Sequence, residues 1–244
     1  TGNIRIIDPG WQLRAQPFYT ASNLFASGSE AGLLGITLDP NFASNKYVYV
    51  YYSAINPLRN KIIRLTDVNN QGVNETVIID NLPISPSGIH NGGIIKFGPD
   101  GKLYVVTGDA EQSALAQDVN YLGGKVLRIN SDGSIPSDNP FPNSSVYSLG
   151  HRNSFGFTFH PDTNDLWQTE NGPTTDDEVN RIIAGGNYGW PIVTGIANNP
   201  SYIDPIIAIT PNIAVTGITA IPEGSLVYPE SYHHNLLFAD WNTG

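Results

Sequence analysis

The chain of 244 residues contains neither cysteine nor methionine. Without cysteine it forms no disulfide, thiolate nucleophile or iron–sulfur cluster, and this composition suits an exported protein that folds without disulfides. Without methionine, Thr1 does not follow a retained initiator, so we expect a processed chain or a piece of a longer protein whose signal peptide has been removed. The sequence therefore predicts an extracellular or periplasmic location.

Positive charge and long apolar runs are also scarce. Lys and Arg total 12 against 22 Asp and Glu, which gives a formal net charge of −10. A nucleic-acid partner would require a basic stripe, and docking on anionic lipid a basic patch, so we predict neither. No apolar run approaches the roughly 20 residues that cross a bilayer, and the longest candidate, residues 48–55, is broken by Ser53. We predict no membrane span.

Helical patterning is nearly absent, and a repeat takes its place. The 25 Gly and 18 Pro interrupt the chain too often for long helices, and only residues 113–119 predict a helical turn. The repeat consists of an aromatic residue or Leu, any residue, Pro, an acidic residue or Asn, a short turn and an apolar alternation. Its copies occupy residues 38–53, 97–109, 159–171 and, in degenerate form, 227–241. The prolines are separated by 59, 62 and 68 residues: Pro40, Pro99, Pro161 and Pro229.

Each copy is typical of a β-hairpin. Further strands are expected between the copies, at residues 61–66, 76–80, 125–130 and 178–183. A unit of about 60 residues with about four short strands is the content of a propeller blade. The sequence therefore predicts an all-β fold, a β-propeller with about four to five blades in one domain over residues 1–244. A β-solenoid is the rival architecture, but its rungs repeat at roughly 20–30 residues.

Two residues at strand boundaries suit acid–base chemistry. His90 precedes an Asn-Gly-Gly turn and a strand, and a neutral imidazole is a good general base near neutral pH. The two glycines would let the backbone approach a flat ligand closely. Asp109 follows the strand at residues 103–107, where a carboxylate can orient an imidazole or simply cap a turn.

Arg152, in the segment GHRN at 150–153, is a candidate for contact with a planar anionic ligand. A guanidinium pairs with carboxylates at two points and stabilises an oxygen that gains charge, although a structural salt bridge would also account for this residue. Asn153 can add an amide contact. The loop after Asp109 offers Gln112 and Gln117 as further polar groups.

The segment ENGPTTDDEVN at 170–180 combines a Gly-Pro corner with three consecutive acids. Calcium takes about six to eight oxygen ligands, and backbone carbonyls are common among them. A Gly-Pro corner beside an acidic run is therefore compatible with a calcium site, while a solvated acidic turn is the default interpretation of such a run. Tyr188 and Trp190, in GGNYGWP at 185–191, are interpreted as core and corner residues.

These three segments, together with HNGGIIKFGPDGKLYVVTGD at 90–109, resemble the soluble quinoprotein sugar dehydrogenases, the glucose/sorbosone dehydrogenase family. The resemblance extends over nearly the whole chain. It implies a six-bladed β-propeller that binds pyrroloquinoline quinone (PQQ) and calcium. It also implies oxidation of an aldose sugar at the anomeric carbon, with the electrons passed to an external acceptor.

The resemblance also implies a role for each candidate residue. The catalytic group would be His90 as base, Asp109 as its orienting carboxylate and Arg152 facing the quinone. The cofactor contacts would include Arg152, Asn153 and Gln112. The calcium ligands would be the carbonyls of Gly172 and Pro173 beside the quinone, with Glu178 and the carbonyl of Tyr188 at a second, structural calcium.

Several positions depart from the family pattern. Ile94 stands where relatives commonly carry Arg, and Asn198 replaces a carboxylate of the second calcium site. No Lys or Arg follows Arg181, and the stretch GITAI at 217–221 lacks an expected aromatic pair. These departures favour an alternative, a non-catalytic extracellular propeller module for binding or assembly. A nicotinamide enzyme is disfavoured, because no GxGxxG follows a strand and opens a helix.

The repeat count falls short of the family's blade number. We therefore expect part of the first blade and the closing blade to be absent, which would expose sheet edges at residues 2–7 and 236–240 to self-association or to missing chain segments. Two acceptor triplets, at Asn74 and Asn143, predict glycosylation in a secretory setting and are otherwise chance occurrences.

Overall fold

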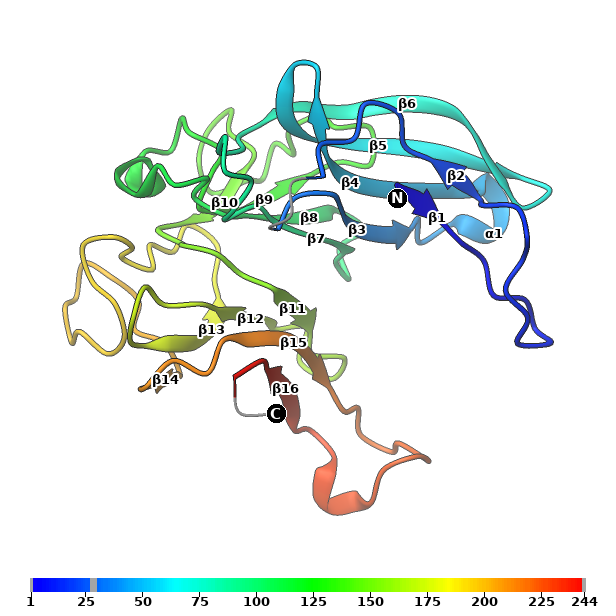
Figure 1. The fold of residues 1–244 in the computed structure, drawn as a ribbon. Coiled ribbons are helices and arrows are strands. Elements are labelled where there is room, and N and C mark those ends of the chain that lie inside the picture. The colour runs from blue at the N-terminus through cyan, green and yellow to red at the C-terminus, as the bar shows by residue number, and fades with distance from the viewer. Residues whose placement is uncertain (1, 27–29, 243–244) are drawn as a thin grey trace.

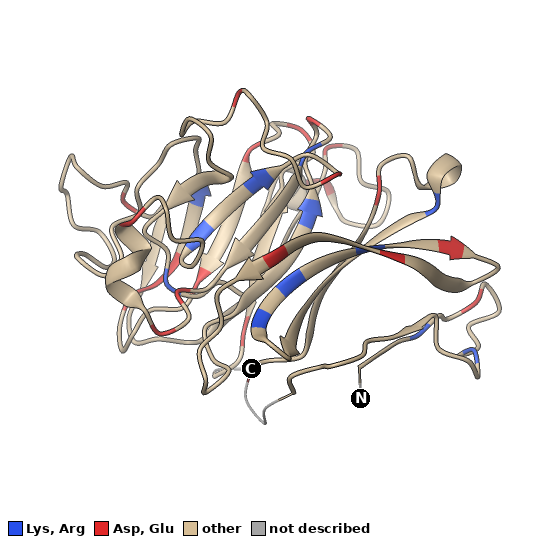
Figure 2. Cartoon of the chain, turned by 90° about the horizontal axis from the view of Figure 1, so that it is seen from above, with Lys and Arg blue, Asp and Glu red and all other residues tan. Residues whose placement is uncertain are grey.

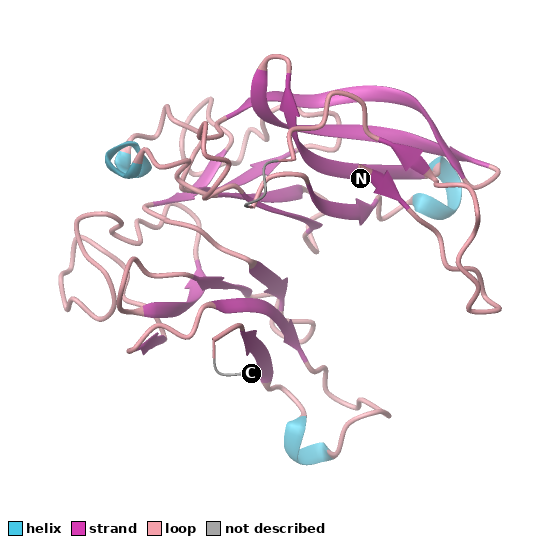
Figure 3. Ribbon diagram, viewed as in Figure 1, coloured by secondary structure: helices cyan, strands magenta, loops and turns pink. Residues whose placement is uncertain are grey.

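Antiparallel strands make up nearly all of the regular structure in the computed structural model, which describes residues 2–26 and 30–242 (Figure 1). The strands are β1 (Asn3–Ile4), β2 (Tyr19–Thr20), β3 (Leu33–Leu38), β4 (Tyr47–Ile55), β5 (Leu58–Val68), β6 (Gln71–Leu82), β7 (Gly92–Phe97), β8 (Leu103–Thr107), β9 (Lys125–Ile129), β10 (Val146–Leu149), β11 (Gly156–Phe159), β12 (Leu166–Glu170), β13 (Asp177–Ile182), β14 (Ile207–Ile209), β15 (Val215–Ala220) and β16 (Leu236–Asp240). The helical segments of the described ranges are short: α1 (Phe42–Asn45), η1 (Ser113–Gln117) and η2 (Glu230–Tyr232) (Figure 3). None of them is long and apolar enough to cross a membrane.

The strands form consecutive sheets along the chain. Over the described residues, four-stranded sheets run from β3 to β6, from β7 to β10 and from β11 to β14, and two-stranded sheets pair β1 with β2 and β15 with β16. The first strands β3, β7, β11 and β15 contact one another in that order, so they lie innermost. Figure 1 shows the sheets as successive blades around a common centre. This is a β-propeller, and the predicted fold class is confirmed.

Alternation of side chains along the second strand of each blade builds the core. Successive residues of a strand point to opposite faces. On β4, Tyr49 and Tyr51 pack against the second blade, while Val48 and Val50 pack against the segment that carries β1 and β2. Residues of β8 divide in the same way between the first and third blades. Both faces of these strands are therefore buried between neighbouring blades.

A Gly-x-Thr-x-x-Pro pattern marks the innermost strand of the blades. It reads GITLDP at 35–40, GFTFHP at 156–161 and GITAIP at 217–222, with IIKFGP at 94–99 as a divergent copy. The fourth proline of the repeat is therefore Pro222, and the predicted start at Pro229 is wrong. The reason is that β15 ends at Ala220, whereas Pro229 lies within the 221–235 connection to β16. With Pro222 the last step is 61 residues, close to the other two.

Glycine is required where innermost strands of adjacent blades meet. A Cβ on Gly35 would collide with the carbonyl oxygen of Gly93 on β7, and a Cβ on Gly156 with the carbonyl oxygen of Thr216 on β15. Backbones approach this closely only where one residue lacks a side chain. Gly217, at the equivalent position of β15, faces open space instead.

The strands predicted between the hairpins all form, as β5, β6, β9 and β13. The sequence did not predict the outermost strands β10 and β14, which are four and three residues long. Asn74 on β6 and Asn143 in the loop before β10, the two predicted acceptor sites, are both exposed.

Candidate active site

Loops from the same end of three adjacent blades form the candidate site. Within a blade the first two strands are antiparallel, so the residue before the first strand and the residue after the second lie at one edge. β7 and β8 place His90 and Asp109 at this edge, and β11 and β12 place Arg152 and Glu170 at the equivalent edge of the next blade. Glu30, just ahead of β3, takes the corresponding place in the first blade.

His90 and Asp109 form a directly bonded pair. His90 Nδ1 lies 2.7 Å from Asp109 Oδ1, and the aspartate is 1% exposed while the imidazole is 15% exposed. A carboxylate accepts from Nδ1–H, so the other ring nitrogen, Nε2, carries the free lone pair. His90 has φ +56°, in the left-handed region that few non-glycine residues adopt. The backbone is therefore held in an uncommon conformation at the residue predicted to be the base.

Asp109 gathers donors from three loops. Its Oδ2 accepts from the indole Nε1 of Trp190 at 2.8 Å, and its Oδ1 also accepts from the backbone N–H of Glu111 at 2.9 Å. The backbone N–H of Asp109 donates to the carbonyl of Arg152 at 2.8 Å. Trp190 was interpreted as a corner residue, so sequence reasoning missed its contact with the pair. Only the fold brings residues 109 and 190 together.

Arg152 lies beside this pair. Its guanidinium sits over the ring of Trp190, 5.5 Å from the centroid, and Nη1 donates to the carbonyl of Asn171 at 3.0 Å. Its backbone N–H donates to Glu170 Oε1 at 2.5 Å. Within the described ranges the guanidinium forms no ion pair, so the structural salt bridge considered for Arg152 does not occur there. The positive charge stays available to a ligand.

Asn153 connects the first three blades. Its Oδ1 accepts from the backbone N–H of Gly92 at 3.1 Å, and its Nδ2 donates to Glu30 Oε2 at 3.2 Å. The same Glu30 oxygen accepts from the backbone N–H of His90 at 2.7 Å. Asn153 is 2% exposed, so it braces the loops. Sequence reasoning missed Glu30, which lies 60 residues before His90.

The two candidate glutamines differ in their surroundings. Gln112 is exposed, and its backbone N–H donates to the carbonyl of Asp109 at 2.9 Å. Gln117 turns inward instead: its Nε2 donates to the carbonyl of Trp190 at 2.7 Å and to Asn187 Oδ1 at 3.1 Å. Gln117 therefore anchors the loop that brings Trp190 to Asp109.

The three consecutive acids have separate environments. Asp177 is fully buried and accepts from the backbone N–H groups of Gly172, Ile213 and Ala214. Asp176 lies at the surface, where hydrogen bonds from threonine hydroxyls, Thr210 first, lower its pKa. Glu178 is 7% exposed and accepts from the backbone N–H of Gly195 at 2.8 Å. The run is not a uniformly solvated turn.

A small cavity of about 10 Å³ joins the predicted metal ligands to the pair's surroundings. It is lined by Arg152, Glu170, Asn171, Gly172, Pro173, Asp176, Glu178, Tyr188, Trp190, Val193 and Thr194. Burial, and then the nearby carboxylate of Glu170, raise the pKa of Glu178 to about 8. Two buried carboxylates thus share one small space, and among the lining residues Arg152 is the only cation.

One expectation about this region needs correction. Gly92 and Gly93 do not leave room for a flat ligand, because a Cβ on Gly92 would meet the carbonyl of Val106 and one on Gly93 the side chain of Leu34. Their role is close packing of neighbouring strands. Asn198, which the resemblance places at a carboxylate position of the second calcium site, is exposed and does not line the cavity, and its backbone N–H donates to Asp204.

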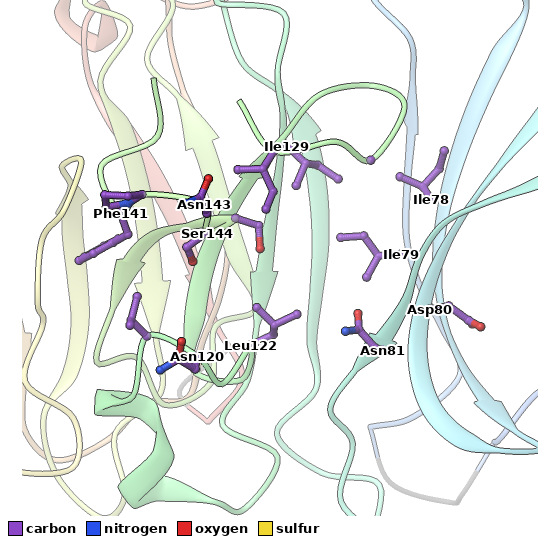
Figure 4. A pocket seen from close by; sticks show the side chains of 15 residues that line it. Ile78, Ile79, Asp80, Asn81, Asn120, Leu122, Ile129, Phe141, Asn143 and Ser144 are labelled. Carbon is purple, nitrogen blue, oxygen red and sulfur yellow. The ribbon is translucent and has the colours of Figure 1, made fainter. Parts of the chain in front are cut away.

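The basic residues are unevenly distributed along the chain, and a second, larger cavity lies away from this site. Lys and Arg lie on the blades up to Arg181 of β13, and β15 and β16 carry none (Figure 2). A second cavity, of about 610 Å³, lies between β6 and the loops around β9 and β10 (Figure 4). Ile79, Leu122 and Phe141 line it together with amide and hydroxyl side chains, and none of the candidate site residues does.

Together the fold and the site define a β-propeller of the sugar dehydrogenase type. The sequence model of the family described as Glucose / Sorbosone dehydrogenase matches residues 1–240. The chain belongs to this family, as its motifs predict.

Individual relatives agree with that assignment. The chain is 36% identical over 232 residues to quinoprotein glucose dehydrogenase B of Acinetobacter calcoaceticus, covering 83% of this chain and 48% of that protein. It is 33% identical over 203 residues to aldose sugar dehydrogenase YliI of Escherichia coli K12, covering 79% and 54%. The PQQ-bound aldose sugar dehydrogenase of Streptomyces coelicolor superposes with a TM-score of 0.83 at 35% identity, covering 90% of this chain and 66% of that one. The chain thus spans about half the length of the curated relatives it matches.

Proposed function

We propose that the chain carries the sugar-oxidising site of a PQQ- and calcium-dependent aldose dehydrogenase. The observation that carries the proposal is the bond between the buried Asp109 carboxylate and His90 Nδ1, which leaves Nε2 free to act as a base. Membership of a family that includes quinoprotein and aldose sugar dehydrogenases supports an aldose as the substrate.

Three residues of the chain have separate proposed roles in the reaction. His90 Nε2 accepts the proton of the anomeric hydroxyl while the hydrogen on the anomeric carbon leaves as hydride. Asp109 stabilises the imidazolium that forms and holds the ring in one orientation. Arg152 places a positive charge beside the developing negative charge of the acceptor. When bound, PQQ supplies the two-electron acceptor and calcium supplies Lewis acidity at a quinone oxygen.

The residues around Gly172 fit a calcium ion. Glu178 is buried and makes no ion pair within the described residues, so its carboxylate lacks a compensating charge. Asn212 donates to the Gly172 carbonyl at 3.1 Å, and its own Oδ1 is buried without a partner. A carboxylate, a backbone carbonyl and an amide oxygen are the ligand types that calcium prefers. Gly172 and Pro173 are therefore the proposed ligands of the calcium beside the quinone, and Glu178 with the carbonyl of Tyr188 those of a second, structural calcium; all four residues line the cavity.

The surroundings of Arg152 fit the quinone end of PQQ. The guanidinium is free of ion pairs among the described residues and lies over the ring of Trp190, with Nη1 bonded to the carbonyl of Asn171. We propose that its remaining N–H groups contact a carboxylate or quinone oxygen. Gln112 and Asn153 are proposed as further contacts. No Lys or Arg follows Arg181 to pair with the other carboxylates of PQQ, so we expect Arg152 to contribute a large share of the affinity.

We further propose that the electrons pass to an external acceptor and that the protein acts in an exported compartment. The cysteine-free, acidic composition supports the second point. Glycosylation at Asn74 and Asn143 stays a prediction for a secretory host.

Reconstitution tests the proposal. The protein is titrated with PQQ in the presence of calcium while cofactor absorbance and dye-linked oxidation of a panel of aldoses are recorded. We expect a saturable absorbance change with one quinone per chain, and sugar-dependent dye reduction. His90→Gln should retain the absorbance change and lose roughly 100-fold or more of kcat, the usual contribution of a general base.

The alternative, a non-catalytic binding module, predicts neither signal. It is not favoured, because the His90–Asp109 pair is intact and the family includes sugar dehydrogenases. If the protein shows neither saturable PQQ binding nor sugar-dependent dye reduction, the binding-module alternative would be favoured.

A further inference from the structure

A second cluster of titratable side chains lies where the third blade meets the β15–β16 hairpin. His160 and Asp162 belong to the turn between β11 and β12, and His234 lies at the end of the 221–235 connection. One ligand atom from each residue lies within 4.8 Å of the other two. We propose that His160, Asp162 and His234 bind one divalent transition-metal ion of the zinc type.

The distances are close to those of a tetrahedral site. Asp162 Oδ2 is 2.9 Å from His234 Nδ1 and 3.9 Å from His160 Nδ1. With metal–ligand distances of about 2.0–2.1 Å, two ligand atoms on one tetrahedral ion lie about 3.4 Å apart. Changes of about half an ångström would bring both of these separations to that value, and the third, between the two imidazoles, lies within 4.8 Å.

The hydrogen bonds of His160 fix the tautomer that has its lone pair on Nδ1. Its Nε2 lies 3.1 Å from the backbone carbonyl of His234, to which it can only donate. Nδ1 is therefore unprotonated, and the backbone N–H of Asp162 indeed donates to it at 3.3 Å. A ligating histidine whose other N–H is held by a backbone carbonyl is the usual arrangement at protein metal sites. An ion at Nδ1 would displace this contact, and because Asp162 lies at the surface, water can then accept from its N–H.

The other two ligands are also positioned by neighbours. The backbone N–H of Glu223 donates to Asp162 Oδ2 at 3.0 Å, which orients the carboxylate. His234 has φ +61°, a conformation that non-glycine residues rarely adopt, and the centroid of its ring lies 6.3 Å from that of His160. The two rings are nearly parallel, so the exposed ring of His234 must rotate to direct its lone pair at a shared ion. The side chain of His234 is 54% exposed, which leaves a fourth coordination position open to water.

The ligand types decide the class of metal. Two imidazoles and one carboxylate suit zinc and its neighbours in the transition series, whereas calcium and magnesium take oxygen ligands. An ion here would connect the turn of the third blade to the hairpin that follows it. This site shares no residue with the candidate active site, so the inference stands independently of the proposed function.

The adjacent His233 provides a matched control. Its Nδ1 accepts from the backbone N–H of Gly224 at 3.3 Å, and its Nε2 lies 3.2 Å from the carbonyl of Ser225. Both of its ring nitrogens are used within the 221–235 connection, so it should not contribute to the metal site.

Calorimetric titration of the chelator-treated protein with Zn²⁺, in excess calcium to fill oxygen-rich sites, tests the proposal. We expect one Zn²⁺ per chain, and visible absorption of tetrahedral type when Co²⁺ replaces it. Asp162→Asn and His234→Gln should each weaken Zn²⁺ binding by roughly 10- to 100-fold or more. His233→Gln should bind as the wild type does, and Zn²⁺ should raise the thermal midpoint of the wild type and of His233→Gln, and not that of Asp162→Asn or His234→Gln.

Two results would overturn the proposal: no stoichiometric Zn²⁺ binding by the wild type, or binding that Asp162→Asn and His234→Gln leave unchanged. Both substituted residues are exposed, so the variants should fold, and far-UV circular dichroism verifies this.

Discussion

The carboxylate of Asp109 receives hydrogen bonds from His90, from the indole of Trp190 and from the backbone of Glu111. A carboxylate with several donors is fixed in position, and it fixes the ring that it holds. Trp190 also carries the guanidinium of Arg152 on its face. One indole therefore contacts both the carboxylate that orients the base and the cation.

Trp190→Phe isolates the hydrogen bond, because phenylalanine keeps an aromatic face for Arg152. We expect kcat for sugar oxidation to fall roughly tenfold, the effect of losing about 1.5 kcal/mol from a hydrogen bond to a charged group. The pH profile of kcat should also shift, which a purely structural role would not cause.

Trp167→Phe is the matched control. Trp167 Nε1 is buried without a partner, so its removal should leave activity unchanged and stability equal or slightly higher. Equal losses of activity in the two variants would contradict a positioning role for Trp190.

Glu178 should make stability depend on pH and calcium together. Burial raises its pKa to about 8, so the folded protein retains a proton that the unfolded chain has lost. The stabilisation is complete below about pH 4.5 and is lost as the pH rises through about 8. Without calcium, the thermal midpoint of the wild type should therefore fall over this range relative to that of Glu178→Gln, and calcium should reverse the fall.

The comparison with Glu178→Gln is needed because buried Lys125 acts in the opposite sense. Desolvation lowers the pKa of Lys125 to about 7, so its unfavourable effect is relieved as the pH rises above that value. Midpoints measured in a calcium chelator from pH 5 to 9 give the difference between the proteins. Parallel curves would show that Glu178 is not the responsible group.

At the scale of elements, the Gly-x-Thr-x-x-Pro pattern fixes how tightly blades meet. Gly156→Ala would drive a Cβ into the backbone of β15, and we expect the free energy of unfolding to fall by about 1–3 kcal/mol. Gly217→Ala, at the equivalent position of the next blade, meets open space and should leave stability unchanged or slightly raised. Urea denaturation compares the two variants. Similar losses at both positions would indicate an intrinsic strand preference for glycine and not a blade contact.

Local sequence patterns decide which elements could be predicted. Regular proline spacing and buried alternating strands identify the hairpins and the strands β5, β6, β9 and β13. The fourth copy was misplaced because its connection is long and contains a second proline, Pro229. The strands β10 and β14 have three or four residues, too few for an alternation to stand out.

At the scale of the whole molecule, the C-terminal hairpin exposes apolar surface. Phe238 on β16 is 37% exposed and Trp241 is 81% exposed, and within the described residues β16 pairs only with β15. A strand of this kind invites pairing with another chain. We predict concentration-dependent self-association in light scattering, and Phe238→Lys should suppress it.

Leu226→Lys serves as the control, because Leu226 is fully exposed in the loop and not on the strand. If both variants suppress association equally, general apolar contact and not strand pairing is responsible. A chain that stays monomeric at high concentration would contradict the prediction.

The candidate site contains residues that the sequence could identify and others that it could not. His90, Asp109 and Arg152 lie in short motifs at strand ends, where residue type and local pattern suggest chemistry. Glu30 and Trp190 act through contacts 60 and 81 residues away in the chain, and no local pattern reports such partners. The packing role of the paired glycines at 92 and 93 also became visible only with the neighbouring blades in place.

The brace between Glu30 and Asn153 joins residues 123 positions apart. During folding, such a contact forms only after a large loop has closed, because the entropy of closure is lost before the contact contributes. The His90 loop depends on Glu30 and Asp109 on Trp190, so the pair reaches its working geometry only once three blades have docked. Recovery of activity in a refolding experiment should therefore lag behind recovery of strand content.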